Sequence, residues 1–193
     1  MTRSLLLLLA ITSFGLCSCG KDGTSAPIDE TARIAAAKRL AQQVGANLLA
    51  ELNRALELKD ATTTTALGVC NTRAPAIVQT STLDGLHVRR IGTRVRNKLL
   101  GSPDAQDKEA LATFESMPPD ALLTAQEVRR PDGQWRLYLP IVIQTPLCLR
   151  CHGPVDQIEQ AVKDKLLELY PGDEATGYSI GDLRGAFVVE TKQ

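Results

Sequence analysis

The sequence predicts an α+β domain, and three observations lead to this class. Apolar residues with helical spacing occupy residues 29–59, several segments between residues 86 and 190 alternate apolar with polar side chains, and Pro-Asp-Gly at residues 131–133 separates two of those segments. Helices that precede antiparallel strands, with further helices inserted between them, are typical of α+β domains. The chain has 193 residues, which is enough for one domain of ordinary size.

The first expected element is a long helix from Asp29 to about Lys59. Asp29 is a suitable N-cap residue. Large aliphatic residues recur at every fourth position and form one stripe, made of Leu40, Val44, Leu48, Leu52 and Leu56. We expect this stripe to pack on the chain's own domain rather than on a partner helix. A second, shorter helix is expected to begin at residues 62–65 and to carry Cys70.

The later elements are predicted from the period of their apolar residues and from Pro, Gly and Asp at their ends. Strands are expected at residues 86–91, 122–130, 134–143 and 185–190, the middle two as a hairpin. Helices are expected at residues 75–80, 102–117 and 155–169, followed by a loop at 170–182. Trp135, Leu137 and Leu139 share one face of their strand, so this face is predicted to contribute to the core.

The first residues are typical of an export signal rather than of the folded domain. Arg3 precedes a short apolar run at residues 5–11, small residues follow, and the run is too short to span a bilayer. The sequence Leu16-Cys17-Ser18-Cys19-Gly20 resembles the lipobox of bacterial lipoproteins, with Cys19 as the lipidated residue. A plain signal peptide with incidental cysteines is the alternative.

These observations predict a lipoprotein signal peptide at residues 1–18, a tether at 19–28 and one domain at 29–193. Gly rather than Asp follows Cys19, which resembles lipoproteins that are sent to the outer membrane of Gram-negative bacteria. We therefore expect the protein on the periplasmic side, bound to the membrane through its lipid. The 22 basic and 22 acidic residues balance and only 4% of residues are aromatic, so nothing indicates nucleic-acid binding.

Cys148-Leu149-Arg150-Cys151-His152 has the C-x-x-C-H pattern of c-type haem attachment. Two intervening residues let the chain turn so that both thiols reach the two vinyl groups of the porphyrin, and the adjacent histidine then binds iron. Three alternatives compete: a zinc site completed by Cys70 or His87, a redox-active disulfide, and a structural disulfide. In an exported chain the five-residue pattern favours haem c, attached through Cys148 and Cys151.

The sixth iron ligand is not decided by the residues alone. The candidates are Cys70, His87 and Met117. Cys70 follows an apolar helical segment, whereas His87 belongs to an alternating strand beside Arg89 and Arg90. These patterns leave Cys70 and His87 as equal candidates.

Several segments together resemble a family of single-haem c-type domains with a PAS-like fold, formerly classed as a domain of unknown function. The matching segments are Cys70 with Ala74–Ile77, Val88–Ile91 with Arg96-Asn97, Tyr138–Ile141, Cys148–Gly153, Tyr170–Tyr178 and Gly181–Gly185. The chain departs from the family pattern after the paired arginines, at residues 91–93 and 97–99. The resemblance implies a PAS-like antiparallel sheet with a long N-terminal helix and flanking helices around one c-type haem. It also implies Cys70 as the distal iron ligand.

Under this interpretation, arginines are expected to bind the haem propionates, because the guanidinium fork suits carboxylates. Arg89 and Arg90 are the first candidates, with Arg94 or Arg96 in addition. We expect a lipid-anchored electron-transfer or redox- or gas-sensing protein with an unidentified redox or signalling partner. It is not expected to be an enzyme, because a Cys70 ligand would close the iron face that a peroxidase needs. The alternative is a haem-free binding module stabilised by zinc or a disulfide.

Overall fold

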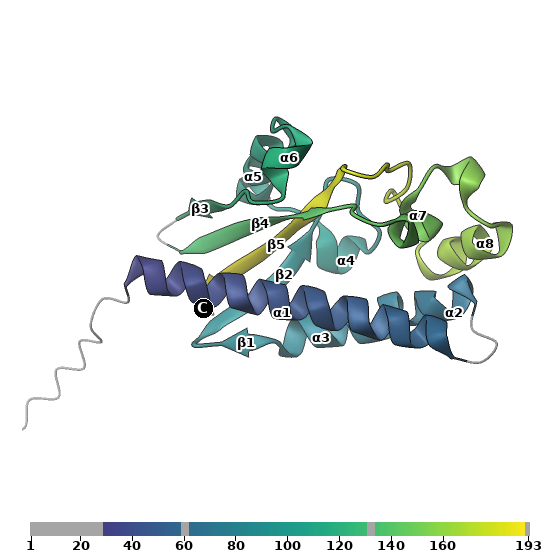
Figure 1. The fold of residues 1–193 in the computed structure, drawn as a ribbon, viewed down its shortest axis with the longest axis horizontal. Helices are drawn as coiled ribbons and strands as arrows, with labels where there is room; N and C mark the ends of the chain where they lie inside the picture. Colours follow the sequence, from purple (N-terminus) through teal and green to yellow (C-terminus); the bar gives the residue numbers. More distant parts are fainter. Residues whose placement is uncertain (1–28, 59–61, 131–133, 192–193) are drawn as a thin grey trace, which may run out of the picture.

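The computed structural model describes residues 29–58, 62–130 and 134–191. Its centre is an antiparallel sheet of five strands in the order β1-β2-β5-β4-β3, with helices on both faces (Figure 1). The strands are β1 (Thr82–Leu83), β2 (Leu86–Ile91), β3 (Glu127–Arg129), β4 (Arg136–Val142) and β5 (Leu183–Thr191). The long N-terminal helix, the antiparallel sheet and the flanking helices confirm the predicted α+β class.

The helices and helical turns occupy the N-terminal part of the described chain and the connections between strands. They are α1 (Glu30–Glu57), α2 (Thr63–Gly68), the π-helical turn η1 (Val69–Arg73), α3 (Ala74–Thr80), α4 (Lys98–Gly101), α5 (Ala105–Glu115), α6 (Pro119–Leu122), α7 (Pro146–His152), the 3₁₀ turn η3 (Val155–Gln157) and α8 (Gln160–Leu169). The predicted signal peptide and the whole tether at 19–28, with Cys19, fall outside the described residues. Among the described helices, none combines the length and the apolar character that crossing a membrane requires.

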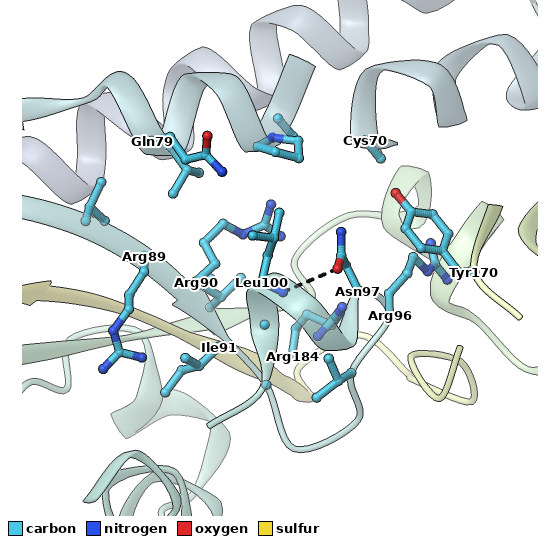
Figure 2. Close-up of a pocket in the computed structure, with 18 of the residues that line it drawn as sticks. Cys70, Gln79, Arg89, Arg90, Ile91, Arg96, Asn97, Leu100, Tyr170 and Arg184 are labelled. Atoms are coloured by element: carbon cyan, nitrogen blue, oxygen red, sulfur yellow. Dashed lines mark hydrogen bonds between the residues drawn. The ribbon is translucent and has the colours of Figure 1, made fainter. Parts of the chain in front are cut away.

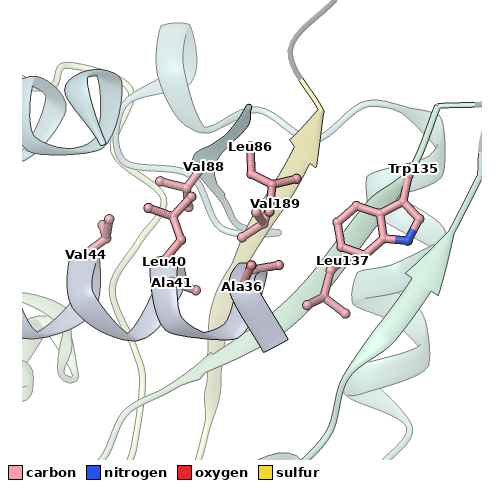
Figure 3. Close-up of a cluster of buried hydrophobic side chains, with 10 residues drawn as sticks. Ala36, Leu40, Ala41, Val44, Leu86, Val88, Trp135, Leu137 and Val189 are labelled. Atoms are coloured by element: carbon pink, nitrogen blue, oxygen red, sulfur yellow. The ribbon is translucent and has the colours of Figure 1, made fainter. Parts of the chain in front are cut away.

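Helix α1 covers one face of the sheet with the first part of the predicted stripe. Leu40 and Val44 are buried in this core and Leu48 is partly buried against it, whereas Leu52 and Leu56 lie outside the cluster. The Asp29 side chain caps the helix by accepting a hydrogen bond from the Thr31 N–H at 3.1 Å. Side chains of α1 pack on β2, β4 and β5 in one cluster (Figure 3), which contains Ala36, Leu40, Ala41, Val44, Leu86, Val88, Trp135, Leu137 and Val189. The sheet face predicted for Trp135 and Leu137 is therefore a core face, and burial of this area stabilises the fold.

The opposite face of the sheet is covered by α5 and α6. Tyr138, Ala186 and Val188 point to this side and pack on Leu111 and Phe114 of α5. A charged network lies beside this cluster, at the fully buried Asp107. Asp107 accepts two hydrogen bonds from Arg89 at 2.7 and 2.8 Å and one from the Tyr138 hydroxyl at 3.0 Å. The network joins α5 to the sheet, because Arg89 belongs to β2 and Tyr138 to β4. Each buried charge in it has a partner of opposite sign, which offsets the cost of burying the charge.

Several predicted boundaries are wrong for identifiable reasons. Cys70 lies in η1 and not in the preceding α-helix, which ends at Gly68. The expected strand at 122–130 shortens to β3, because α6 occupies residues 119–122. The expected helix at 155–169 divides into η3 and α8, since Ile158 and Glu159 are extended and Ile158 is buried against Leu67 of α2. The other predicted helices and strands are present within a few residues of the predicted ends.

Gly185 allows β5 to approach β2 at a point where no side chain fits. Its φ is +154°, and a Cβ at this position would overlap the Ile91 carbonyl oxygen. We expect Gly185→Ala to lower the free energy of unfolding by about 1–3 kcal/mol from backbone strain alone, measured by denaturant or thermal unfolding. Gly68→Ala is the matched control, because Gly68 has helical φ and open space around it, and it should be neutral or stabilising.

Candidate functional site

A cavity of about 390 Å³ lies at the end of the sheet, between β2, η1, α3 and α4 (Figure 2). This volume lies within the range of about 300–1,000 Å³ that is usual for small-molecule and cofactor sites. The cavity wall combines apolar residues such as Pro75, Val78 and Ile141 with charged and metal-ligating side chains. Cys70 and His152, which are far apart in the sequence, both line it.

His152 ends α7, and its ring is fixed by contacts on two sides. Its Nδ1 lies 2.7 Å from the Ala175 carbonyl oxygen and therefore donates a hydrogen bond to it. This bond leaves Nε2 as the unprotonated nitrogen, available to bind a metal. The Tyr178 ring packs edge-on against the imidazole at 6.2 Å between centroids. Burial first, and then the charges of Arg96 and Arg184, hold the pKa of His152 well below its usual value, so the imidazole is neutral.

Helix α7 begins with Pro146 and ends where Gly153 must be a glycine. A Cβ on Gly153 would lie 2.6 Å from the Leu149 carbonyl oxygen, which accepts the hydrogen bond from the Gly153 N–H at 2.9 Å. The loop after α8 is attached to this end of the helix. The Gly177 and Tyr178 N–H groups donate to the carbonyls of Gly153 and His152 at 2.8 and 2.9 Å. The backbone of the C-x-x-C-H motif is therefore held on both sides.

Cys148 and Cys151 precede His152 on α7, and neither lines the cavity. Cys148 packs beside Ile143 and Tyr178, and Cys151 packs in the cluster that joins α8 to α2. Both are half-buried and free, and no disulfide joins them. Burial is the main cause that raises the pKa of Cys151 to about 11, so this group is a protonated thiol at neutral pH.

Cys70 faces the cavity from η1, in one turn of π-helix. Such turns insert a residue into an α-helix and occur often at functional sites. The turn is continuous with α2 before it and α3 after it. Figure 2 shows Cys70 at the upper right of the cavity, with Tyr170 below it. Cys70 is half-buried and free, so its sulfur is not taken up by a disulfide.

Arg89 and His87 line the cavity, but their side chains pair with carboxylates on the opposite face of β2. Arg89 binds Asp107 and also Glu190, with Nε at 2.8 Å from the Glu190 carboxylate. The His87 Nε2 lies 3.2 Å from the same Glu190 carboxylate. The strand alternates, so Arg90 points to the other side, and Figure 2 shows Arg89 directed away from Cys70. Of the two arginines that were expected to face a cofactor, the structure turns only Arg90 toward the cavity.

Arg94 and Arg96 bind the loop after α8 instead of facing outward as a solvated charge run. Arg96 is buried and pairs with Asp173 at 2.9 Å, and it also donates to the carbonyls of Cys151 and Ala175. Arg94 donates to the Thr176 carbonyl at 2.7 Å and lies over the Tyr178 ring. Both arginines thus fix the segment that carries the Ala175 carbonyl, the hydrogen-bond partner of His152.

Arg184 is a cavity residue that the alternation pattern did not predict. In β5, Gly185 pairs with Ile141 whereas Leu183 pairs with Val142, so Arg184 is one extra residue in a β-bulge. A bulge interrupts the alternation and redirects a side chain, and Arg184 lines the cavity beside Arg90. In the sequence only the glycine after Arg184 hints at this irregularity.

The zinc and disulfide alternatives find no support in the described part of the chain. Within it, no group of three or more His, Cys, Asp and Glu side chains is placed to hold a metal ion. Cys70, Cys148 and Cys151 are all free thiols. A site with two potential ligands that face one cavity is different from a closed tetrahedral zinc site.

The chain was compared with known families, curated proteins and solved structures. A family described as Tll0287-like matches residues 26–191, which confirms the resemblance identified from the motifs. One solved structure, described as the crystal structure of the cyanobacterial heme-protein Tll0287, is similar with a TM-score of 0.57 and 22% sequence identity. The similarity covers 87% of this chain and 98% of that chain and supports the fold. No curated protein matches.

Proposed function

Since this chain belongs to the Tll0287-like family, we propose that it is an exported, lipid-anchored protein that carries one covalently bound haem c. Cys148 and Cys151 would hold the porphyrin through thioether bonds, and His152 would bind the iron. The observation that carries this proposal is the cavity that Cys70 and His152 both line beside the C-x-x-C-H motif. The similar cyanobacterial structure is described as a heme-protein, which supports the same cofactor here.

The side chains in and around the cavity fit a haem. The neutral His152 has a free Nε2, which is the form of imidazole that binds iron. Cys148 and Cys151 are free thiols on one short helix, three residues apart. The cavity is apolar where α3 and β4 face it, and it is lined by four arginines and by no Asp or Glu among the described residues. A flat apolar ring with two carboxylates suits such a wall.

We propose Cys70 as the second iron ligand, in preference to His87. Both residues line the cavity. The His87 Nε2 is paired with Glu190 on the face of β2 that Arg89 also uses, whereas the Cys70 thiol is free. Iron with an anionic sulfur ligand favours the ferric state, and a filled sixth position excludes other ligands until that sulfur leaves. The role that fits these properties is electron transfer or haem-based redox or gas sensing, with a separate protein partner.

The proposal is tested by producing the full chain in a bacterial host that is competent in cytochrome c maturation. After boiling and denaturing electrophoresis, the wild-type band should retain haem-dependent peroxidase staining, because thioether bonds survive denaturation. The matched variant Cys148→Ala/Cys151→Ala should lose the stain completely while the protein remains detectable with an antibody. A wild-type band without stain, or with stain that persists in the double variant, would contradict covalent attachment.

A further inference from the structure

Arg90 and Arg184 are cations in the cavity wall that lack counter-ions within the described part of the chain. Four arginines line the cavity, and two of them are neutralised elsewhere, Arg89 by Asp107 and Glu190 and Arg96 by Asp173. The Arg90 side chain makes no hydrogen bond or ion pair with the described residues, and its Nε is buried. The Arg184 Nε is also buried without a partner, and its Nη1 donates at 3.2 Å to the Arg94 carbonyl.

Uncompensated buried charge is costly, so two such arginines in one cavity indicate a missing anion. Burial is the main cause that lowers the pKa of Arg184, to about 10, and the positive charge of Arg90 contributes to this shift. Burial also lowers the pKa of Arg90. Arginine side chains stay protonated in proteins, so two positive charges lie in one cavity wall and an anion bound there would offset their repulsion.

The fold directs both side chains to the cavity by unrelated means. Arg90 follows the regular alternation of β2, on the same face as Val88 and opposite to Arg89. Arg184 reaches the cavity because the β5 bulge turns it away from the face of Ala186 and Val188. Figure 2 shows Arg90 and Arg184 at separate positions below Cys70.

We propose that Arg90 and Arg184 form a two-carboxylate site, which binds the two propionates of the haem. This inference rests on the proposed function, and it replaces the pair Arg89 and Arg90 expected from the sequence. The guanidinium fork of each arginine can donate two hydrogen bonds to one carboxylate, and each such charged contact strengthens binding by about tenfold or more.

The test compares haemin with haemin dimethyl ester, which has the same ring but no carboxylates. Each compound is titrated into the full mature chain made without haem, and binding is followed in the Soret band. The wild-type chain should bind haemin about tenfold or more tightly than the ester, and Arg90→Gln/Arg184→Gln should bind both equally. If the wild type and the double variant both bind haemin and prefer it over the ester by the same factor, the two-carboxylate site is overturned. The haem proposal would remain intact in that case.

Arg89→Gln is the matched variant, because it removes the same charge from the neighbouring position of β2. It should lower the melting temperature, since it leaves Asp107 and Glu190 underneutralised, and it should keep the preference for haemin. Loss of the preference in Arg89→Gln alone would assign the carboxylates to Arg89 and overturn the proposal. Failure of the wild-type chain to bind haemin, together with absence of haem after maturation, would instead contradict the proposed function.

A second measurement remains available if the chain does not fold without haem. In the haem-loaded protein, Arg184→Gln and Arg90→Gln should each make the midpoint potential more negative, because removal of a nearby cation favours the more positive ferric state. Arg39→Gln, on the exposed face of α1, should leave the potential unchanged. Potentials equal to that of the wild type in both cavity variants would contradict the site.

Discussion

Replacing Cys70 by alanine in the haem-loaded protein is expected to change the iron from low-spin to high-spin and to open its sixth position. The ferric electron paramagnetic resonance spectrum should lose its low-spin thiolate features, and the reduced protein should bind CO rapidly. Loss of the anionic ligand should also raise the midpoint potential by on the order of 100 mV, within the span of about 0.8 V that axial ligands produce. The covalent attachment should persist, because Cys148 and Cys151 are unchanged.

His87→Ala is the comparison that makes the Cys70 experiment decisive. His87 lines the same cavity, but its Nε2 is 3.2 Å from the Glu190 carboxylate. We expect the spectrum and the potential of His87→Ala to match those of the wild type. A spectrum that changes in His87→Ala and stays the same in Cys70→Ala would assign the ligand to His87 and refute the assignment of Cys70.

The sequence was sufficient to predict the elements whose signals are local. The apolar face of α1, the Asp29 cap, the alternation of β2 and the antiparallel pairing of β3 with β4 were predicted from neighbouring residues, and each is found in the structure. The Pro131-Asp132-Gly133 turn predicted between these two strands lies outside the described residues. The family resemblance depended on motifs that are contiguous in the sequence, and the family match confirms it. Proximity of Cys70 to the C-x-x-C-H motif was implied only by that resemblance, because eighty or so residues separate them.

The properties that sequence reasoning missed arise from pairing between distant segments. Arg89 and Arg90 are indistinguishable in a charge run, and only the sheet register shows that one of them faces Asp107 on α5. In a regular strand Arg184 would lie on the same face as Ala186 and Val188, which pack on α5. The bulge opposite Ile141 and Val142 places it on the cavity side instead. The π-helical turn that contains Cys70, at Val69–Arg73, includes no Gly or Pro that would have indicated it in the sequence. The nearest glycine, Gly68, belongs to the preceding helix α2. Registers and bulges are set by the partner strand, so a single segment does not encode them.

Arg96→Ala is expected to lower the free energy of unfolding by about 3–5 kcal/mol, the usual cost of removing one partner of a buried ion pair. The side chains of Arg96 and Asp173 are 7% and 9% exposed, so the Asp173 carboxylate would remain buried without its cation. Arg96 also donates to the carbonyls of Cys151 and Ala175, and the Ala175 carbonyl orients His152. Denaturant unfolding measures the loss, and the yield of haem-loaded protein should fall with it.

Three comparisons separate this buried role from a general effect of charge. Lys98→Ala removes an exposed ion pair with Glu174, the residue that follows Asp173. This change should alter the free energy of unfolding little. Arg96→Lys should recover only part of the loss, because an ammonium group cannot reach Asp173 and two carbonyls as the guanidinium fork does. Arg96→Met/Asp173→Leu should be more stable than Arg96→Ala, since the double change leaves no buried charge without a partner. If the double variant is instead less stable than Arg96→Ala, the hydrogen bond that Asp173 accepts from the Ala175 N–H at 2.8 Å outweighs the cost of leaving its carboxylate without a cation.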